Sequence, residues 1–215
     1  MKNCINTSKK ARWLLILLTI NLLGGCQVFK REQPQTIINK SEQQRQLALT
    51  QLQHWQVKGK LIFKSPQEKF SASLNWTQQS THSDIRLTSF LGMSILKMLN
   101  DGNIATLISD GKTLTSDDPE SLLYETKGIT LPINDMPHWM KGLTSKDFDR
   151  TTVFDEHNRV KQIKLLDATG RPWQIDYQSY LQATLKRQNY QLPKKIRLTG
   201  NNITIIIKIS DWELY

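Results

Sequence analysis

The chain has 215 residues, with 29 lysines and arginines against 19 aspartates and glutamates, so its formal net charge is +10. Its hydrophobic content of 38%, with only 10 glycines and 7 prolines, excludes a disordered or collagen-like chain. Two cysteines exclude a small scaffold held together by many disulfides. The composition indicates one medium-sized globular domain, although the basic balance alone would also suit a nucleic-acid binder.

Residues 1–25 have the organisation of a bacterial export signal. A basic segment without acidic residues precedes an apolar run from Trp13 to Leu23, shorter than the roughly 20 residues that a membrane-spanning helix needs. The run ends in Leu23-Gly24-Gly25-Cys26, which resembles the lipobox of bacterial lipoproteins. This resemblance implies cleavage before Cys26, diacylation of its sulfur and acylation of the new N-terminus. The alternative is an ordinary signal peptide or transmembrane helix with a chance cysteine.

Processing at Cys26 would change the net charge of the chain and anchor it to a membrane. Four basic residues would leave with the signal peptide, so 25 would remain against 19 acidic residues, a net charge of +6 before the termini. Gln27 stands where an aspartate would resemble the retention signal of inner-membrane lipoproteins, so we expect the outer membrane, on its periplasmic face. An exported, membrane-anchored protein is not expected to bind nucleic acid.

Residues 26–40 are polar, lack periodicity and contain a proline, so we expect them to form the lipidated N-terminus and a flexible tether. Ser41 and Gln44 resemble a capping box, and apolar residues then recur at helical spacing. This pattern predicts an amphipathic helix over 42–53.

From Trp55 onward the apolar residues recur every second position, as in strands with one buried face. Asp101-Gly102 and Asp110-Gly111 are typical of tight hairpin turns. Because no helix-length connection separates these segments, they are predicted to pair as an antiparallel meander. The predicted strands of this first run cover 55–64, 70–77, 84–88, 94–99, 104–109 and 112–116.

Residues 117–143 interrupt the strands with a predicted helical insert. Asp118-Pro119-Glu120 is typical of a helix start, and a short helix should end at Gly128. Asp135 is expected to cap a second short helix that continues to Gly142. Strands then resume, giving about eleven in all, and the insert is suited to cover the open face of a curved sheet. The predicted strands of this second run cover 151–155, 159–167, 171–181, 194–199 and 203–213.

Motifs for catalysis and metal binding are missing from the sequence. No HExxH, CxxC or GxSxG occurs, and the four histidines are scattered without metal-ligand spacing. Gly111-Lys112-Thr113 looks like the end of a P-loop, but the first glycine of that motif would fall on Thr106, and a hairpin is expected at Gly111. We therefore expect no enzyme activity, no metal and no cofactor.

The basic residues of the mature chain have two interpretations. Lys58, Lys60 and Lys64 lie on the polar side of a predicted strand, and the pairs Lys186-Arg187 and Lys194-Lys195 lie near the C-terminus. They fit solvated faces and guards of strand edges. Attraction to anionic lipid or to an acidic protein partner is the alternative.

The predicted turn at 89–93 has an unusual composition, because Phe90, Leu91 and Met93 surround a single glycine where polar turn residues are the rule. If exposed, the turn is suited to dip into a membrane, with Leu91 the residue best placed to protrude. One leucine contributes about 1.5–3 kcal/mol on burial, enough for a reversible contact. In the alternative, Phe90 and Met93 fold back into the core.

The helical insert is rich in apolar residues, including two methionines, which suit a surface that adapts to varied apolar guests. An ordinary helix-on-sheet core is the alternative. The apolar residues of the insert are Leu122, Leu123, Ile129, Leu131, Ile133, Met136, Trp139 and Met140.

The order and spacing of several stretches, together with the lipobox, resemble the LolB family of outer-membrane lipoprotein receptors. The resemblance covers about 41–213, so we expect one domain over 41–215. The stretches are WQVKGKLIF (55–63), LNWTQ (74–78), DIRLTSFLG (84–92), LISDGKTLTSDDPESLL (107–123), GITLPINDMPHWMKG (128–142), WQIDY (173–177) and LPKKIRL (192–198).

The resemblance implies a mainly β fold, an unclosed antiparallel β-barrel of about eleven strands under an α-helical lid, with a hydrophobic cavity. It implies a monomer that accepts lipoproteins from the periplasmic carrier LolA and inserts them into the outer membrane, in contact with cargo acyl chains and outer-membrane lipid. The family's protruding loop leucine corresponds to Leu91. Phe90 stands where the family pattern usually has proline, which makes this loop less rigid.

Strand parity predicts which residues line that cavity, although a one-residue error would turn a whole strand over. Two other functions stay open: a lipid- or glycolipid-binding outer-membrane lipoprotein of the same half-barrel fold, and a lipoprotein that scaffolds protein partners around a filled interior. The predicted lining is Trp76, Leu87, Leu96, Met98, Leu107, Trp173, Ile175 and Tyr177 from the sheet, with Leu123, Met136, Trp139 and Met140 from the lid.

Overall fold

The computed structural model describes residues 41–143, 149–167 and 169–215. The predicted signal peptide (1–25), the tether (26–40) and Cys26 lie outside the described residues. Within these residues, no helix combines the length and the apolar character needed to cross a bilayer.

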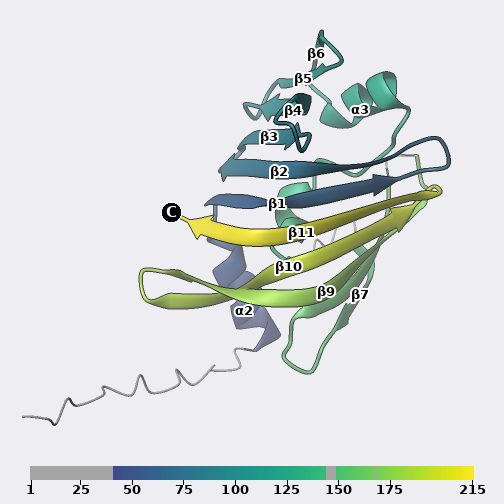
Figure 1. Ribbon diagram of the computed structural model, residues 1–215. Helices are drawn as coiled ribbons and strands as arrows, with labels where there is room; N and C mark the ends of the chain where they lie inside the picture. The colour runs from purple at the N-terminus through teal and green to yellow at the C-terminus, as the bar shows by residue number, and fades with distance from the viewer. Residues whose placement is uncertain (1–40, 144–148, 168) are drawn as a thin grey trace, which may run out of the picture. The chain divides into compact units, whose positions relative to one another are not determined.

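One antiparallel sheet forms the body of the described chain (Figure 1). Its strands follow the order β6-β5-β4-β3-β2-β1-β11-β10-β9-β8-β7, and the edge strands β6 and β7 are not paired with each other. The prediction of an unclosed antiparallel sheet of about eleven strands is therefore confirmed. The strands are β1 (His54–Lys64), β2 (Lys69–Gln79), β3 (His82–Thr88), β4 (Ser94–Asn100), β5 (Ala105–Ser109), β6 (Lys112–Ser116), β7 (Asp149–Phe154), β8 (Val160–Leu166), β9 (Pro172–Leu185), β10 (Gln188–Gly200) and β11 (Ile203–Leu214).

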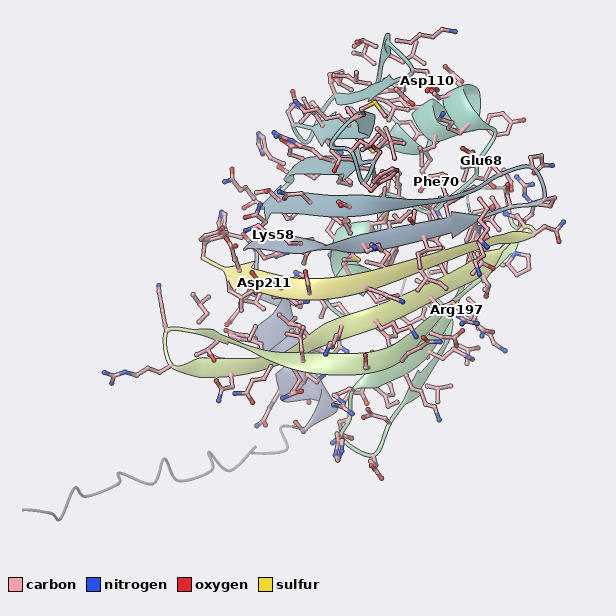
Figure 2. The ribbon with its side chains drawn as sticks, viewed as in Figure 1. Lys58, Glu68, Phe70, Asp110, Arg197 and Asp211 are labelled. Carbon is pink, nitrogen blue, oxygen red and sulfur yellow. The ribbon has the colours of Figure 1, made fainter. Side chains whose placement is uncertain are left out.

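The first and the last strand meet in the middle of the sheet, where β1 pairs with β11 from Trp55↔Leu214 to Lys64↔Thr204. The register shifts at Gly59. A Cβ added to Gly59 would lie 2.2 Å from the carbonyl oxygen of Lys208, so the close backbone approach at this seam requires glycine. Figure 2 shows Lys58 and Asp211 near this seam.

The helices begin where the sequence predicts them. Helix α2 (Glu42–Thr50) starts at Ser41, whose hydroxyl accepts a hydrogen bond from the amide of Gln44 at 3.3 Å. It ends earlier than the predicted residue 53, because the chain turns into β1 at His54.

The predicted insert at 117–143 holds two short helices, α3 (Pro119–Lys127) and α4 (Met136–Met140). The carboxylate of Asp118 caps α3, and Gly128 ends it in the left-handed conformation at φ 65°. Residues 117–143 are called the lid below. Figure 1 shows α3 beside the β4–β6 end of the sheet.

The hairpin of β9 and β10 is longer than predicted. Residues 182–193 were expected to separate two strands, but they extend both strands to a two-residue turn at Lys186 and Arg187. Both turn residues have positive φ, at 46° and 67°, as the tight hairpin turn requires. The predicted strand ends at 181 and 194 are therefore wrong, because asparagine and glycine, the usual signals of such a turn, are absent here.

Candidate functional site: an apolar pocket under the lid

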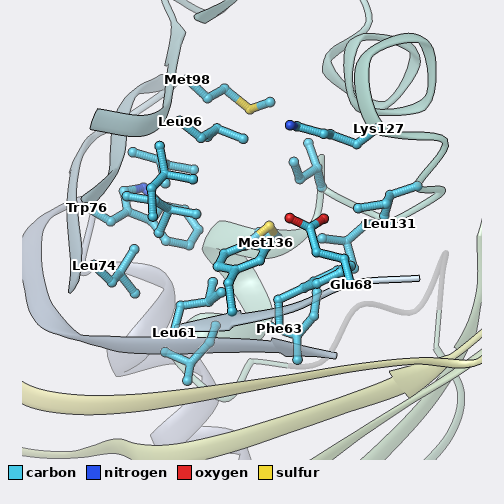
Figure 3. Close-up of a pocket in the computed structure, with 18 residues that line it drawn as sticks. Leu61, Phe63, Glu68, Leu74, Trp76, Leu96, Met98, Lys127, Leu131 and Met136 are labelled. Atoms are coloured by element: carbon cyan, nitrogen blue, oxygen red, sulfur yellow. The ribbon is translucent and has the colours of Figure 1, made fainter. Parts of the chain in front are cut away.

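The sheet and the lid enclose an apolar pocket with a volume of about 130 Å³. Figure 3 shows Trp76, Leu96 and Met98 on one side of the pocket, with Leu131 on the other and Met136 between them. The lining consists of Leu61, Phe63, Glu68, Phe70, Leu74, Trp76, Ile85, Leu87, Ile95, Leu96, Met98, Lys127, Ile129, Leu131, Ile133, Met136, Ile205 and Ile207.

The strand register places the sheet side of this lining in rows across neighbouring strands. Trp76 pairs with Ile85, which pairs with Met98, so three lining residues stand side by side on β2, β3 and β4. A second row consists of Leu74, Leu87 and Leu96. Because alternate residues of a strand face the same way, the period-two pattern of the sequence builds an apolar wall.

The lid side comes from the segment between α3 and α4 and from the start of α4. Ile129, Leu131 and Ile133 line the pocket at alternate positions, followed by Met136. Thr130 and Pro132, which stand between them, are not part of the lining, so this loop resembles a strand with one apolar face.

The predicted lining residues fall into two groups in the structure. Trp76, Leu87, Leu96, Met98 and Met136 line the pocket. The remaining seven are buried in the hydrophobic core outside this lining: Leu107, Leu123, Trp139, Met140, Trp173, Ile175 and Tyr177. Their contact with an acyl chain stays a prediction.

Most of the unpredicted lining residues carried the same signal as the predicted ones. Leu61, Phe63, Leu74 and Ile205 stand on the apolar side of period-two strands. The alternation along a strand identifies which residues share its apolar face, but it does not identify which of them border the pocket. The charged lining residues Glu68 and Lys127 had no sequence signal.

The lid is held at Thr130 by two turns of the sheet. The Thr130 hydroxyl accepts hydrogen bonds from Nη2 of Arg171 at 3.0 Å and from Nδ2 of Asn201 at 3.2 Å. Arg171 follows the β8–β9 turn and Asn201 lies in the β10–β11 turn. Thr130 stands between the pocket residues Ile129 and Leu131, so these bonds fix the segment that covers the pocket.

The side chain of Asp167 supports the hydrogen bonds at Thr130. Its fully buried carboxylate accepts hydrogen bonds from Nδ2 of Asn201 at 3.1 Å and from the Thr169 hydroxyl at 2.6 Å, and Nε of Arg171 lies 3.6 Å away. Burial opposes ionisation of Asp167, but the hydrogen bonds of Thr169, Arg171, Thr130 and Asn201 outweigh it and hold the pKa well below its usual range. The carboxylate therefore stays charged and orients both donors to Thr130.

Three further contacts hold the lid. The hydroxyl of Tyr177 on β9 donates to the carbonyl oxygen of Trp139 at 2.5 Å. The buried ammonium group of Lys141 donates to the carbonyl oxygen of Leu52 at 2.9 Å, and burial lowers the pKa of Lys141 to about 8. Lys127, at the end of α3, forms an ion pair of 2.7 Å with Asp110. Polar contacts thus distribute over the whole length of the lid.

The loop between β3 and β4 presents its apolar side chains to solvent. Phe90 is 92% exposed, Leu91 68% and Met93 62%. Hydrogen bonds close the base of the loop, with the amide of Ser89 donating to the carbonyl of Met93 at 2.8 Å. The alternative in which Phe90 and Met93 fold back into the core is therefore wrong. Three large apolar side chains are thus exposed together on one loop.

Gly111-Lys112-Thr113 lies at the β5–β6 hairpin, and a strand follows the glycine. The segment therefore lacks the helix N-terminus with which a P-loop binds phosphate. In the part of the chain that the structure describes, no three histidine, cysteine or acidic side chains are arranged to hold a metal ion.

The described chain is thus an open antiparallel sheet with an apolar pocket under a helical lid. Comparisons with known proteins show the family to which it belongs. The family described as "Outer membrane lipoprotein LolB" matches residues 53–212. The chain therefore belongs to the LolB family of outer-membrane lipoproteins.

Individual relatives support this assignment. The outer-membrane lipoprotein LolB of Pseudoalteromonas translucida is 38% identical over 159 residues, covering 74% of this chain and 75% of the relative. The protein of the same name from Ectopseudomonas mendocina is 30% identical, covering 94% of this chain and 96% of the relative. A solved structure of a LolA superfamily protein from Nitrosomonas europaea shares the fold, with a TM-score of 0.53 at 9% identity, covering 82% of this chain and 94% of that one.

Proposed function

We propose that this protein accepts lipoproteins from the periplasmic carrier LolA and inserts them into the outer membrane, sheltering their acyl chains in the pocket during transfer. The observation that carries the proposal is the apolar pocket under a lid held by polar contacts, in a chain of the LolB family. Residues 1–25 would be the signal peptide, 26–40 the tether anchored by acylated Cys26, and 41–215 the transfer domain.

Acyl chains need such a shelter because each CH₂ group exposed to water costs about 0.8 kcal/mol. Transfer would run down a gradient of affinity, from the carrier through this pocket to the bilayer, since a guest moves only as far as differences in affinity drive it.

The pocket is too small for this cargo in the state described. A cavity of about 150 Å³ holds benzene, and drug-sized ligands occupy pockets of about 300–1,000 Å³, against about 130 Å³ here. Cargo would therefore enter when the lid contacts at Thr130, Trp139 and Lys127 break and the pocket widens.

The β3–β4 loop would complete delivery. Leu91 and Phe90 at its exposed tip would enter the bilayer reversibly, at about 1.5–3 kcal/mol for each buried side chain. This contact would bring the pocket to the membrane surface where cargo leaves.

The test is transfer of a lipoprotein from cargo-loaded LolA to a soluble form of this protein that lacks Cys26, followed by delivery to liposomes. We expect wild-type protein to accept and deliver cargo. Leu91→Glu should still accept cargo but lose most of the delivery, because a charge at the loop tip opposes burial in the bilayer. Leu47→Glu is the matched control, since Leu47 is a similarly exposed leucine (61%) on α2.

Each negative outcome points to a different error. Binding of free lipid without acceptance from LolA would indicate a lipid- or glycolipid-binding lipoprotein instead. Normal delivery by Leu91→Glu would refute the role of the loop.

A further inference from the structure

Two charged residues line the otherwise apolar pocket. Of its 18 lining residues, Glu68 and Lys127 are the ionisable ones. In Figure 3 the ammonium group of Lys127 and the carboxylate of Glu68 point toward the pocket beside Leu131. Sixteen apolar neighbours suit acyl chains, but they do not explain a carboxylate and an ammonium group at one side of the pocket.

Glu68 is presented by a well-ordered turn between β1 and β2. The amide of Ser65 donates to the carbonyl of Glu68 at 2.8 Å, and the amide of Glu68 donates to the Ser65 hydroxyl at 3.0 Å. Phe70, two residues further along, continues the apolar wall, and Figure 2 labels both side chains at this end of the sheet. Among the described residues, no side chain pairs with the Glu68 carboxylate. This exposed carboxylate is therefore available to a ligand.

Lys127 belongs to the lid. It is the last residue of α3, and Gly128 ends the helix directly after it. Its ammonium group is held by Asp110 at 2.7 Å, while the lysine side chain is 28% exposed. An ammonium group has three protons to donate, so the ion pair leaves donors for a second acceptor on the pocket side.

We propose that Glu68 and Lys127 form a subsite for the polar junction of a triacylated cargo, where acyl chains join the cysteine and the peptide begins. This inference rests on the proposed function. The junction carries ester and amide carbonyls that accept hydrogen bonds, and peptide N–H groups that donate them. Lys127 would donate to a carbonyl and Glu68 would accept from an N–H, while the acyl chains lie against the apolar wall.

The charges argue for this ligand over a free fatty acid. A fatty carboxylate at this side of the pocket would lie near the Glu68 carboxylate, and like charges repel. The acylated junction is uncharged and presents donors and acceptors together, which matches one acceptor and one donor at the same side of the pocket. A zwitterionic phospholipid headgroup also offers both signs, and the experiment separates it from the cargo.

The test compares three ligands on the soluble protein lacking Cys26: a synthetic triacylated cysteine–serine peptide, an apolar fluorescent probe, and phosphatidylethanolamine vesicles. Glu68→Gln and Lys127→Met should each weaken binding of the triacylated peptide about 3- to 10-fold, as expected for a charge-assisted hydrogen bond in a partly exposed site. Glu68→Gln should bind the apolar probe within twofold of wild type, and Lys127→Met should bind it as Asp110→Asn does, because both of these variants lack the ion pair that holds the lid. Asp110→Asn is the matched control, because it removes the ion pair with Lys127 but keeps both charged residues in the pocket lining.

Unchanged peptide binding by both variants would overturn the subsite alone. An equal loss for the peptide and the probe would overturn it as well, since it would show an effect on the lid. Weaker binding to phosphatidylethanolamine vesicles with unchanged peptide binding would assign the pair to phospholipid. A wild-type protein that binds the probe but no triacylated peptide would refute the proposed function, and the subsite with it.

Discussion

Replacing Thr130 with valine should loosen the lid without changing its shape. Valine keeps the branched side chain and removes the hydroxyl that accepts from Arg171 and Asn201. The neighbours Ile129 and Leu131 stay on the pocket side. The substitution therefore removes the hydrogen bonds at Thr130 and leaves the apolar lining residues of the lid in place.

The size of the effect follows from the hydrogen bonds of the Thr130 hydroxyl, which accepts from Arg171 and Asn201 and also bonds to Asp167. A hydrogen bond to a charged donor contributes about 1.5–3 kcal/mol and one to a neutral donor about 0.5–1.5. Thr130 is half-buried and Arg171 exposed, so solvent reduces both and we expect about 1–2 kcal/mol in total. The open population of the lid should rise about 5- to 30-fold. Hydrogen exchange at the amides of residues 129–131 and 133 measures this, together with the rate at which an apolar fluorescent probe enters.

Thr126 provides a matched control within the same lid. Its buried hydroxyl has no hydrogen-bond partner in the described structure, so Thr126→Val should leave exchange and probe entry unchanged. Thr130→Ser, which retains the hydroxyl, should stay close to wild type. Equal hydrogen exchange in Thr130→Val and wild type would show that the Thr130 hydrogen bonds do not hold the lid. An equal increase in Thr130→Val and Thr126→Val would refute their role as well.

Two further substitutions test the electrostatics of the lid and the packing of the seam. Burial lowers the pKa of Lys141 from 10.5 to about 8, so between pH 8 and 10.5 unfolding takes up a proton and stability rises with pH by up to about 1.4 kcal/mol per unit. Lys141→Met should abolish that rise in urea denaturation curves, and an unchanged slope would contradict the assignment. Gly59→Ala should lower stability by about 1–3 kcal/mol, because its Cβ would lie 2.2 Å from the Lys208 carbonyl oxygen. An unaltered melting temperature would show that the seam tolerates the methyl group.

Local patterns were sufficient to predict most of the fold. Period-two alternation identified the strands, and Asp118 and Gly128 marked the two ends of α3. The β9–β10 hairpin was underestimated because its turn consists of Lys186 and Arg187, which carry no turn signal. Their positive φ angles are imposed by the pairing of the two strands.

The pocket was less predictable, because its outline depends on how far the lid descends onto the sheet. Trp76 and Trp173 both lie on apolar faces, yet Trp76 lines the pocket and Trp173 packs in the core beside Asp167. The hydrogen bonds at Thr130 were missed for a similar reason. Arg171 and Asn201 come from turns far from Thr130 in the sequence, and only the folded sheet brings them together.

The pairing of β1 with β11 has a consequence for how the molecule is made. The β1–β6 meander can form early, but its β1 edge stays open until the final strand arrives, because the sheet order joins the two halves at this seam. Contacts between such distant segments slow folding. Until then β11, with isoleucine at 203, 205, 206, 207 and 209, is a segment prone to aggregation. The arrival of β11 is thus the step that converts two exposed strand edges into one continuous sheet.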